Sequence, residues 1–454
     1  MKTLRRARGS CSGKILMITL FVTGAIGIVL ISALTLIKSQ NQAVAQSQAW
    51  NHCIPVIEAG IEEALAHLNN PRESSLAVNG WTQNGNTYSK PPQKTGGDSY
   101  FDVSIINTNP LLPIIVCTGY VRLAALVAQA NPPVLAAARV SVNGDLFVAR
   151  AVEVTAKRTY LFVKGMVAKE RITMNGNSIF TDSYDSSDTN YCTPAGLYDP
   201  AKNKDNGDVS TISGLENALS TGNANIKGRL RTGPGGIASV GANGSVGSDA
   251  WVDAGNKGIQ PGWFGDDLNI SLPDVDRPSD AGSLGAPGSG TVGTNSYKHL
   301  LGSGTYVMSS LSLGNNEKLG VSGKATLIVD GTVTVTGGID ILPGSTLAIY
   351  VAGPSADIGG AGVNNTGSTT NFIFYGLPTL KNLTLPSNGD FCGAIYAPST
   401  EFKLSGGGST EYHFCGACVA RSVKVDGHYV FHYDEALGSF GPPSKMVIIS
   451  WVEL

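Results

Sequence analysis

Three carboxylates stand close together in the chain, at Asp182, Asp185 and Asp188. Hard cations such as Ca²⁺ take roughly six to eight oxygen ligands, so this cluster is a candidate metal site. The spacing differs from that of an EF-hand loop, and no Glu closes it. The same residues fit a run of turns in which each Asp bonds its own backbone. The sequence leaves both interpretations open.

Cysteines supply a second candidate chemistry. Cys392, Cys415 and Cys418 lie in the C-terminal part of the chain, the last two with CxxC spacing. An oxidising compartment favours a disulfide between Cys392 and one of the pair. Free buried thiols are an alternative. A structural zinc site is a further alternative, because zinc needs four Cys or His ligands. Three histidines lie in the same region, His413, His428 and His432, but a second CxxC is missing.

A compact acidic pair, Asp266 and Asp267, lies beside Trp263 and Asn269, and could contact a cation or a glycan. Polysaccharide-cleaving β-solenoids use clustered carboxylates or a Lys or Arg base on one sheet, and no accompanying basic residue is expected near this pair. The sequence also lacks the spacing of a Ser-His-Asp triad, a phosphate-binding Gly loop and a dinucleotide fingerprint. We therefore expect neither enzymatic activity nor a bound cofactor.

Composition bounds the class of protein. The 454 residues suffice for about three domains. The 57 Gly and 22 Pro show no Gly-X-Y period, which excludes collagen. A net charge of −2, with basic residues concentrated at the extreme N-terminus, argues against nucleic-acid binding, which needs a basic face. Few charges among many Gly, Ser, Thr and Asn are typical of an extracytoplasmic β-protein.

The N-terminus predicts location. Residues 15–37 are uncharged and mainly apolar, long enough for one transmembrane helix. No acidic residue precedes this segment, but five basic residues do: Lys2, Arg5, Arg6, Arg8 and Lys14. The positive-inside rule therefore predicts that residues 1–14 lie in the cytoplasm and the rest of the chain outside an inner membrane. The alternative is a cleaved signal peptide, with Ala43-Val44-Ala45 as the cleavage site. Signal-peptide apolar cores are shorter, about 7–15 residues, which favours the anchor.

The helix is expected to continue over residues 38–70. Apolar residues recur on one helical face: Ile54, Ile57, Ile61, Leu65 and Leu68. Pro55 should kink or restart this helix, and Asn69-Asn70-Pro71 should end it. The apolar face fits packing against the following domain or, alternatively, bundling with equivalent helices of other subunits.

This N-terminal region resembles PilX-type pilus-assembly proteins. The resemblance covers residues 1 to about 70 and rests on the basic start, the apolar span and Ile57-Glu58-Ala59-Gly60-Ile61-Glu62-Glu63-Ala64-Leu65. The chain departs from type IV pilins after Gly13, where Lys14 and Ile15 follow and no acid enters the apolar run. The resemblance implies an assembly role, and the departure argues against prepilin processing and against incorporation as a major pilin subunit.

The remaining chain predicts a mainly β fold. Residues 71–165 indicate a small β-rich or α+β domain. Residues 166–454 indicate a Gly-rich parallel β-solenoid, with a β-sandwich as the alternative. Its evidence is a series of i, i+2 apolar pairs that recur every six to eight residues, many of them followed by Gly: Leu319/Val321, Leu327/Val329, Val333/Val335, Ile339/Ile341 and Leu347/Ile349/Val351.

Residues 182–186, 393–398 and 432–437 resemble three segments, here called landmarks, of an uncharacterised bacterial surface domain. The sequence pattern of that domain is similar to the pattern of polymer-forming bactofilin solenoids. The resemblance implies a structural role. We therefore expect a non-enzymatic, membrane-anchored component of a type IV pilus-like or type II secretion-like system. Its expected partners are other assembly subunits or further copies of itself. The alternatives are a surface adhesin or glycan-binding module and, second, a polysaccharide-active enzyme.

Overall fold

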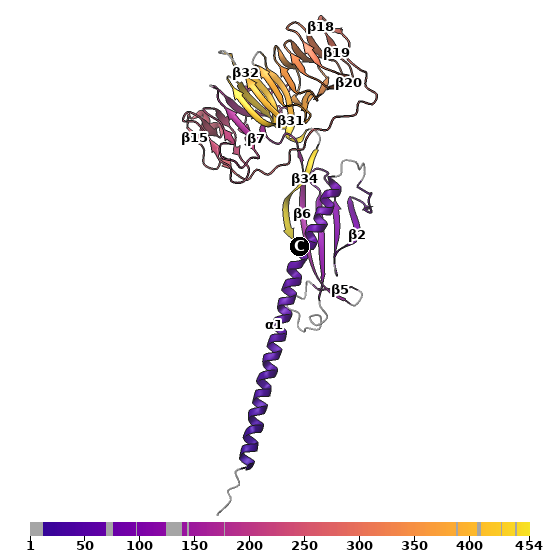
Figure 1. The fold of residues 1–454 in the computed structure, drawn as a ribbon, viewed down its shortest axis with the longest axis vertical. Coiled ribbons are helices and arrows are strands. Elements are labelled where there is room, and N and C mark those ends of the chain that lie inside the picture. Colours follow the sequence, from indigo (N-terminus) through magenta and orange to yellow (C-terminus); the bar gives the residue numbers. More distant parts are fainter. Residues whose placement is uncertain are drawn as a thin grey trace, which may run out of the picture. The chain divides into compact units, whose positions relative to one another are not determined.

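The computed structural model describes residues 12–69, 76–96, 98–123, 139–142, 145–176, 178–386, 389–405, 410–427, 429–440 and 443–454. The chain divides into two compact units, the first with Met1–Arg158 and Met446–Leu454, and the second with Thr159–Lys445. The protein is mainly β with one long N-terminal helix (Figure 1). The sequence predicts one domain over 166–454, whereas the structure places Met446–Leu454 in the first unit.

Helix α1 (Ser12–Leu68) is continuous over 57 residues. Between Ile15 and Ile37 its large apolar side chains are exposed, and the helix is long and apolar enough to cross a membrane. The predicted restart at Pro55 is wrong, because the helix runs through it. Pro55 lies on an exposed side, where water can bond the carbonyl that lacks an N–H partner.

The first unit contains one seven-stranded sheet with the order β1-β2-β3-β4-β6-β34, in which β5 also pairs with β6. Strands β1 to β4, and β6 beside β4, pair antiparallel. The pairing of β34 with β6 is extended by a hydrogen bond of 3.0 Å from the Leu454 N–H to the Ala151 carbonyl. The strand bounds are β1 Thr82–Asn84, β2 Thr87–Gly96, β3 Ser99–Ile106, β4 Ile114–Arg122, β5 Arg139–Val142, β6 Asp145–Tyr160 and β34 Pro443–Glu453.

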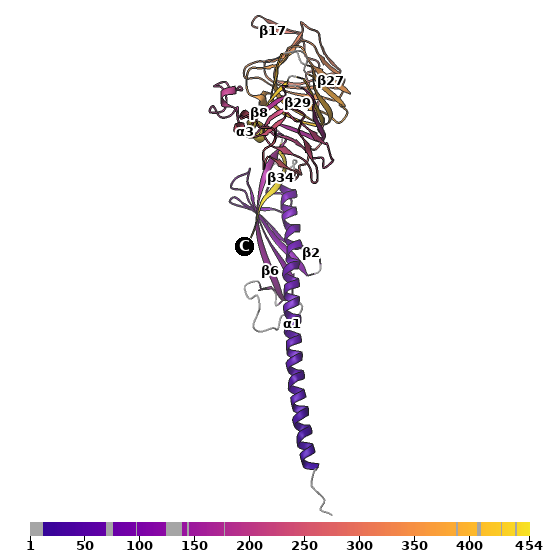
Figure 2. The same ribbon diagram turned by 90° about the vertical axis from the view of Figure 1, so that its left-hand side faces the viewer.

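The C-terminal part of α1 packs on this sheet (Figure 2). Ile57 and Ile61 of the predicted apolar face are buried against β3 and β4, and Leu68 is buried too. Two glycines allow the close approach. A Cβ on Gly60 would lie 2.4 Å from the Cys117 Sγ, and one on Gly119 would lie 2.9 Å from the Cys53 carbonyl oxygen. The apolar face therefore packs within its own chain, as the first of the two interpretations predicts.

The second unit is built on a 25-stranded sheet, and a separate hairpin joins β17 to β18. The bounds are β7 Met166–Met174, β8 Phe180–Tyr184, β9 Val209–Thr211, β10 Leu219–Ser220, β11 Asn225–Lys227, β12 Leu230–Arg231, β13 Ala238–Ser239, β14 Ser245–Gly247, α3 Asp249–Asp253, β15 Gly258–Ile259, β16 Phe264–Gly265, β17 Gly290–Val292, β18 Asn295–Tyr297, β19 His299–Leu301, β20 Gly304–Met308, β21 Leu311–Leu313, β22 Lys318–Val321, β23 Lys324–Val329, β24 Val333–Val335, β25 Gly338–Ile341, β26 Thr346–Val351, β27 Ser355–Ile358, β28 Gly362–Asn365, β29 Phe372–Gly376, β30 Asn382–Pro386, β31 Phe391–Ser405, β32 Tyr412–Asp426 and β33 Tyr429–Asp434, with short 3₁₀ helices η2 Pro200–Lys202, η3 Thr369–Asn371 and η4 Glu435–Ser439.

From β19 onward, most strands pair in parallel with the third strand along the chain, so a three-strand coil repeats. Parallel pairing differs from the antiparallel hairpins of the sandwich alternative. Every predicted inward pair is buried in one apolar core, Val329 included. Gly337 serves a tight corner, because a Cβ there would lie 1.8 Å from the Glu317 carbonyl oxygen.

The chain does not run through these coils in order. Strands β7–β9 form the first coil, and β7 and β8 pair with β32 and β33 of the last. Strands β10–β16 extend from β7–β9 on the other side, and β19 starts at the opposite end (Figure 1). Residues 266–289 connect the two ends, where Leu272 and Val275 join the core and the Tyr396 hydroxyl donates to the Pro273 carbonyl at 2.7 Å. The first and last coils of the unit are therefore neighbours.

Candidate functional site

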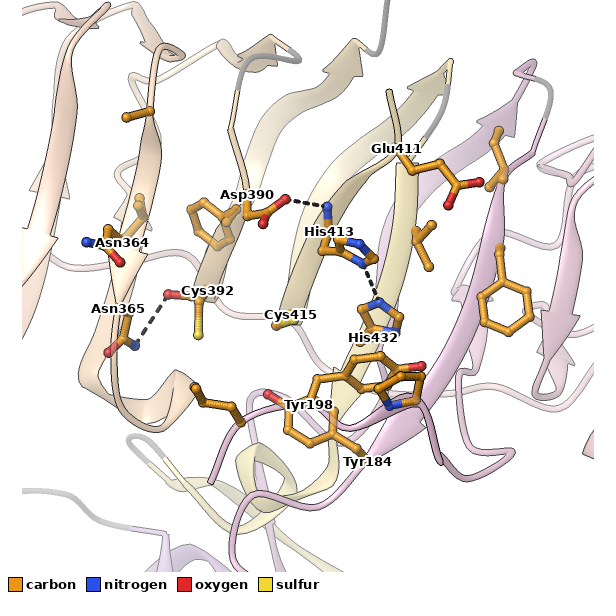
Figure 3. Close-up of a pocket in the computed structure, with 18 of the residues that line it drawn as sticks. Tyr184, Tyr198, Asn364, Asn365, Asp390, Cys392, Glu411, His413, Cys415 and His432 are labelled. Atoms are coloured by element: carbon orange, nitrogen blue, oxygen red, sulfur yellow. Dashed lines mark hydrogen bonds between the residues drawn. The ribbon is translucent and has the colours of Figure 1, made fainter. Parts of the chain in front are cut away.

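A groove of about 970 Å³ lies where the first and last coils meet. Side chains from β8, β28, β31, β32 and β33 line it, together with the loop that carries Tyr198 (Figure 3). Apolar, amide, carboxylate, imidazole and thiol groups all face this space, which makes it the candidate site. Its size is in the range of small-molecule pockets, about 300–1,000 Å³.

Strand alternation produces the lining. Phe391, Phe414 and Phe431 pair across β31, β32 and β33, and neighbouring rings stack in the core at 4.7 and 4.6 Å between centroids. The residue after each Phe points to the opposite face. This gives an outward row across four neighbouring strands, in register: Cys392, Cys415, His432 and Asp182.

A hydrogen-bonded chain starts at the buried carboxylate of Asp182. The Tyr198 hydroxyl donates to its Oδ2 at 2.6 Å, and its Oδ1 lies 2.5 Å from the Nδ1 of His432. His432 Nε2 then lies 2.9 Å from the Nδ1 of His413. Burial first, and the charge of Asp182 second, raise the pKa of the Tyr198 hydroxyl. The carboxylate therefore orients His432 and keeps Tyr198 protonated.

The thiols of Cys392 and Cys415 face the groove, whereas Cys418 is fully buried in the apolar core. All three are free thiols. Burial, with a smaller contribution from the charge of Asp434, raises the pKa of Cys392 to about 12. Burial also holds the pKa of Cys415 well above its usual range. Both side chains are therefore uncharged thiols at neutral pH, and CxxC spacing does not bring Cys415 and Cys418 to one site.

The first and third sequence landmarks form the junction between the coils. His432, Tyr433 and Asp434 pair in register with Asp182, Ser183 and Tyr184. Asp434 accepts hydrogen bonds from the Thr369 hydroxyl and, at 2.9 Å, from the Ser186 N–H. Burial raises the pKa of the Asp434 carboxyl despite these bonds. Glu435 pairs with Lys204 and accepts from the Ser183 hydroxyl at 2.8 Å. The hydrogen bonds and the ion pair of these two landmarks thus hold together two segments that are distant in the chain.

The acidic cluster does not converge on one point. Asp185 accepts from the N–H and hydroxyl of Ser187, and Asp188 accepts from the N–H of Asn190, as the turn interpretation predicts. Asp182 is fully buried and contacts His432 instead. Within the described ranges, no three His, Cys, Asp or Glu side chains are already placed to hold a metal ion. His428, one of the histidines of the zinc alternative, lies outside those ranges.

The second acidic pair has a basic neighbour, contrary to the sequence interpretation. The Arg231 guanidinium lies 2.7 Å from Asp267, and Arg229 stacks over the ring of Trp263 at 4.9 Å. Neither contact could be predicted from the local sequence, because the parallel pairing of β12 with β16 brings together residues about 35 positions apart. Asp267 is neutralised by this exposed pair and does not face the groove.

A short repeat in the sequence marks the site. Phe391-Cys392-Gly393-Ala394 recurs unchanged at Phe414-Cys415-Gly416-Ala417, one coil later. Sequence reasoning did not use this repeat and grouped the cysteines by CxxC spacing instead. It also missed Tyr198, Asn365 and Asp390, which reach the groove from loops or a strand end and follow no recognisable spacing.

A protein-family model described as a domain of unknown function (DUF7305) matches residues 279–440. No curated protein matches the sequence. The competence-associated pilin ComZ from Thermus thermophilus aligns over 88% of this chain and 96% of that chain, with 12% identity and a TM-score of 0.25. The DUF3494 domain of ice-binding protein 1 from Shewanella frigidimarina aligns over 60% and 95%, with 12% identity and a TM-score of 0.20. Likenesses this weak support no functional conclusion.

Proposed function

We propose that this protein is a single-pass, membrane-anchored structural or assembly subunit of a type IV pilus-like or type II secretion-like system, and that it is not an enzyme. The proposal rests on the different surroundings of the two parts of α1. Its first part, up to Ile37, is exposed and apolar, whereas one face from Ala45 to Leu68 packs on the sheet of the first unit. One helix thus serves both a membrane and a folded unit, as the PilX-like N-terminus implies.

Charge gives the proposed orientation. One basic residue, Lys38, directly follows the apolar span, whereas five basic residues precede the span. The positive-inside rule then places residues 1–14 in the cytoplasm and both units outside the inner membrane. On this proposal the second unit is a parallel β-solenoid held outside the membrane, a stiff surface for contacts with partners.

Strand β34 offers a surface for another subunit of the assembly. It ends the sheet order of the first unit, and large apolar side chains along it are exposed, as is Leu454 directly after it: Val447, Ile448, Ile449, Trp451 and Val452. An apolar edge strand left in water is an aggregation hazard, and natural proteins cover or charge such edges. Pairing with a strand of a neighbouring subunit supplies that cover.

The groove supports the non-enzymatic part of the proposal. A cysteine nucleophile needs a lowered thiol pKa, and burial raises those of Cys392 and Cys415. The imidazole of His432 is already engaged by Asp182 and His413.

Co-isolation tests the proposal. Full-length protein purified from membranes is compared with a variant that begins at Gln46, which lacks the apolar span and keeps the packed face of α1 apart from Ala45. The full-length protein should retain pilus or secretion subunits, and Trp451→Arg should weaken this without unfolding. If full-length protein brings down no assembly subunit, the proposal fails.

A second candidate is a glycan-binding module or adhesin, favoured by the amide and carboxylate groups of the groove around Asn364, Asn365 and Asp390. Incubation of full-length protein with a panel of polysaccharides distinguishes the candidates. Binding lost in Asn364→Ala, without cleavage, supports the module; release of shorter products indicates the polysaccharide-active enzyme.

A further inference from the structure

The groove of the second unit is long and narrow. Its lining residues stand on β22, β25, β28, β31, β32, β33, β8 and β11, and each of these strands pairs with the next. Neighbouring strands lie about 4.7–4.9 Å apart, so the distance along the sheet from Lys318 on β22 to Asn225 on β11 is about 34 Å. A volume of about 970 Å³ spread over this length has the shape of one extended polymer chain rather than of a compact molecule.

The floor of the groove favours a polysaccharide over a peptide. Each of these strands is paired on both edges, so the floor presents side chains and no free backbone groups. A peptide lying across it would leave backbone N–H and C=O groups without the partners that buried backbone needs. A sugar ring has hydroxyl groups on its edge and apolar C–H groups on its faces. The lining mixes the same two kinds of group, with amide, hydroxyl and imidazole side chains beside apolar ones: Asn364, Tyr184, His413, Ile179, Phe180, Leu197 and Val430.

The charge of the lining selects the kind of sugar. Among the described lining residues, Lys318 is the only Lys or Arg, and its ammonium lies 3.0 Å from the Asp340 carboxylate. The side chains of Asp390 and Glu411 are exposed, and neither forms an ion pair within the described ranges (Figure 3). The groove is therefore negatively charged and disfavours an acidic polysaccharide, whereas the ammonium groups of an amino sugar would pair with both carboxylates.

A buried hydroxyl group without a partner also indicates a ligand. Tyr184 is 1% exposed and lines the groove beside Tyr198, but its hydroxyl forms no hydrogen bond in the part of the chain that the structure describes. Burial raises the pKa of Tyr184 well above its ordinary value, so the hydroxyl keeps its proton. Buried polar groups normally have a hydrogen-bond partner. A hydroxyl group of a ligand would supply it.

We propose that the groove binds a linear polysaccharide with free amino groups. Asp390 and Glu411 pair with its ammonium groups, and Tyr184 and Asn364 bond its hydroxyl groups. This inference rests on the second candidate function, the glycan-binding module, and names the class of its ligand. It leaves the assembly role unchanged, because a subunit of an assembly can also carry a ligand groove.

Isothermal titration calorimetry on full-length protein in detergent tests the proposal with three probes: a chitosan oligomer, its N-acetylated counterpart and an oligogalacturonate. The chitosan oligomer should bind about tenfold more tightly than its N-acetylated counterpart, because acetylation removes both ammonium–carboxylate pairs. The oligogalacturonate should not bind. The affinity for chitosan should fall as salt is added, because salt screens exposed charges.

Variants locate the binding in the groove. Asp390→Asn and Glu411→Gln should each lower the affinity for chitosan about two- to fivefold, as expected for one exposed ion pair. Tyr184→Phe should lower it about two- to tenfold, as expected for one hydrogen bond. Asp276→Asn, at an exposed acid outside the groove, is the matched control and should bind like the wild type. Thermal melts followed by circular dichroism establish that each variant is folded before affinities are compared.

Three results would overturn the proposal. Equal affinity for chitosan and its N-acetylated counterpart would exclude recognition of the amino groups and leave the glycan-binding module standing. Absence of binding to both would exclude that module as well. Oligolysine that binds as tightly as chitosan, with the same losses in the variants, would replace the polysaccharide with a basic segment of a partner protein. The assembly role fails separately, when co-isolation finds no assembly subunit.

Discussion

The Asp182 carboxylate lies 2.5 Å from the imidazole of His432, although 250 residues separate them in the chain. Asp182 stands on β8 of the first coil and His432 on β33 of the last. The contact thus joins the start and the end of the second unit, and both residues are almost fully buried.

Loss of this contact should destabilise the second unit. Removing one partner of a buried hydrogen bond costs about 1–3 kcal/mol, because the polar group that remains is left unsatisfied. Asp182→Ala is expected to lower the free energy of unfolding by that amount in urea titrations. Asp276→Ala, at an exposed acid, is the matched control and should change it by less than about 0.5 kcal/mol. Equal stability of the two variants would contradict the role of the pair.

Val329→Asp should unfold or aggregate the second unit. Val329 is fully buried, and burying a Val contributes about 1.5–3 kcal/mol. An unpaired carboxylate in the same place adds a larger cost. Lys324→Asp, at an exposed position of the same strand, should melt close to the wild type. A Val329→Asp protein with a wild-type melting curve would mean that this strand is wrongly phased.

Gly60→Ala should loosen the packing of α1 on its sheet. The new Cβ would meet the Cys117 Sγ at 2.4 Å and the Phe101 ring at 2.8 Å. Such overpacking costs about 1–3 kcal/mol. Gly24→Ala adds the same methyl group where nothing lies within 4 Å, and should not lower stability, because Ala is the better helix former. Cys117→Ala in the Gly60→Ala background should restore part of the loss, and no restoration would argue against the clash.

Alkaline pH should destabilise the second unit. The folded-state pKa of Cys392, about 12, is above the ordinary value of 9.0, so the folded state binds more protons between these values. The stability contribution is complete below pH 9 and is lost as the pH rises toward 12, by at most about 1.4 kcal/mol per pH unit. Urea unfolding across this window measures the slope. Cys392→Ala should flatten it, and an unchanged slope would exclude this thiol as a cause.

Topology can be tested with a reporter enzyme fused after Leu454. Basic residues before the apolar span predict that a reporter active only outside the cytoplasm is active there. N-terminal sequencing of the mature protein should find the span still attached. Cytoplasmic activity, or a mature chain that starts at Gln46, would refute the anchored topology.

Local periodicity was enough to predict the inward residues. An i, i+2 apolar pair states which side of a strand faces a core, and so Leu327 and Val329 could be placed from sequence. The apolar length of residues 15–37 likewise predicted a membrane-length helix. Both properties depend on near neighbours in the chain.

Partners distant in sequence could not be predicted in this way. No local pattern states that β8 lies beside β33, because the last coil returns to the first. The groove therefore could not be predicted. The sequence analysis grouped His432 with Cys415 and Cys418 as possible zinc ligands, and did not predict its contact with Asp182. The repeated Phe-Cys-Gly-Ala segment was the one local sign that Cys392 and Cys415 share a register position.

The position of β34 constrains the order of folding. The second unit is inserted between β6 and β34, which are neighbours in the sheet of the first unit. Domains generally fold in the order of their synthesis. Here the sheet on which α1 rests cannot be completed until the whole second unit has been synthesised and β34 follows it. A chain interrupted anywhere in the second unit leaves the edge of β6 open, so completion of the N-terminal unit reports that the rest of the protein has arrived.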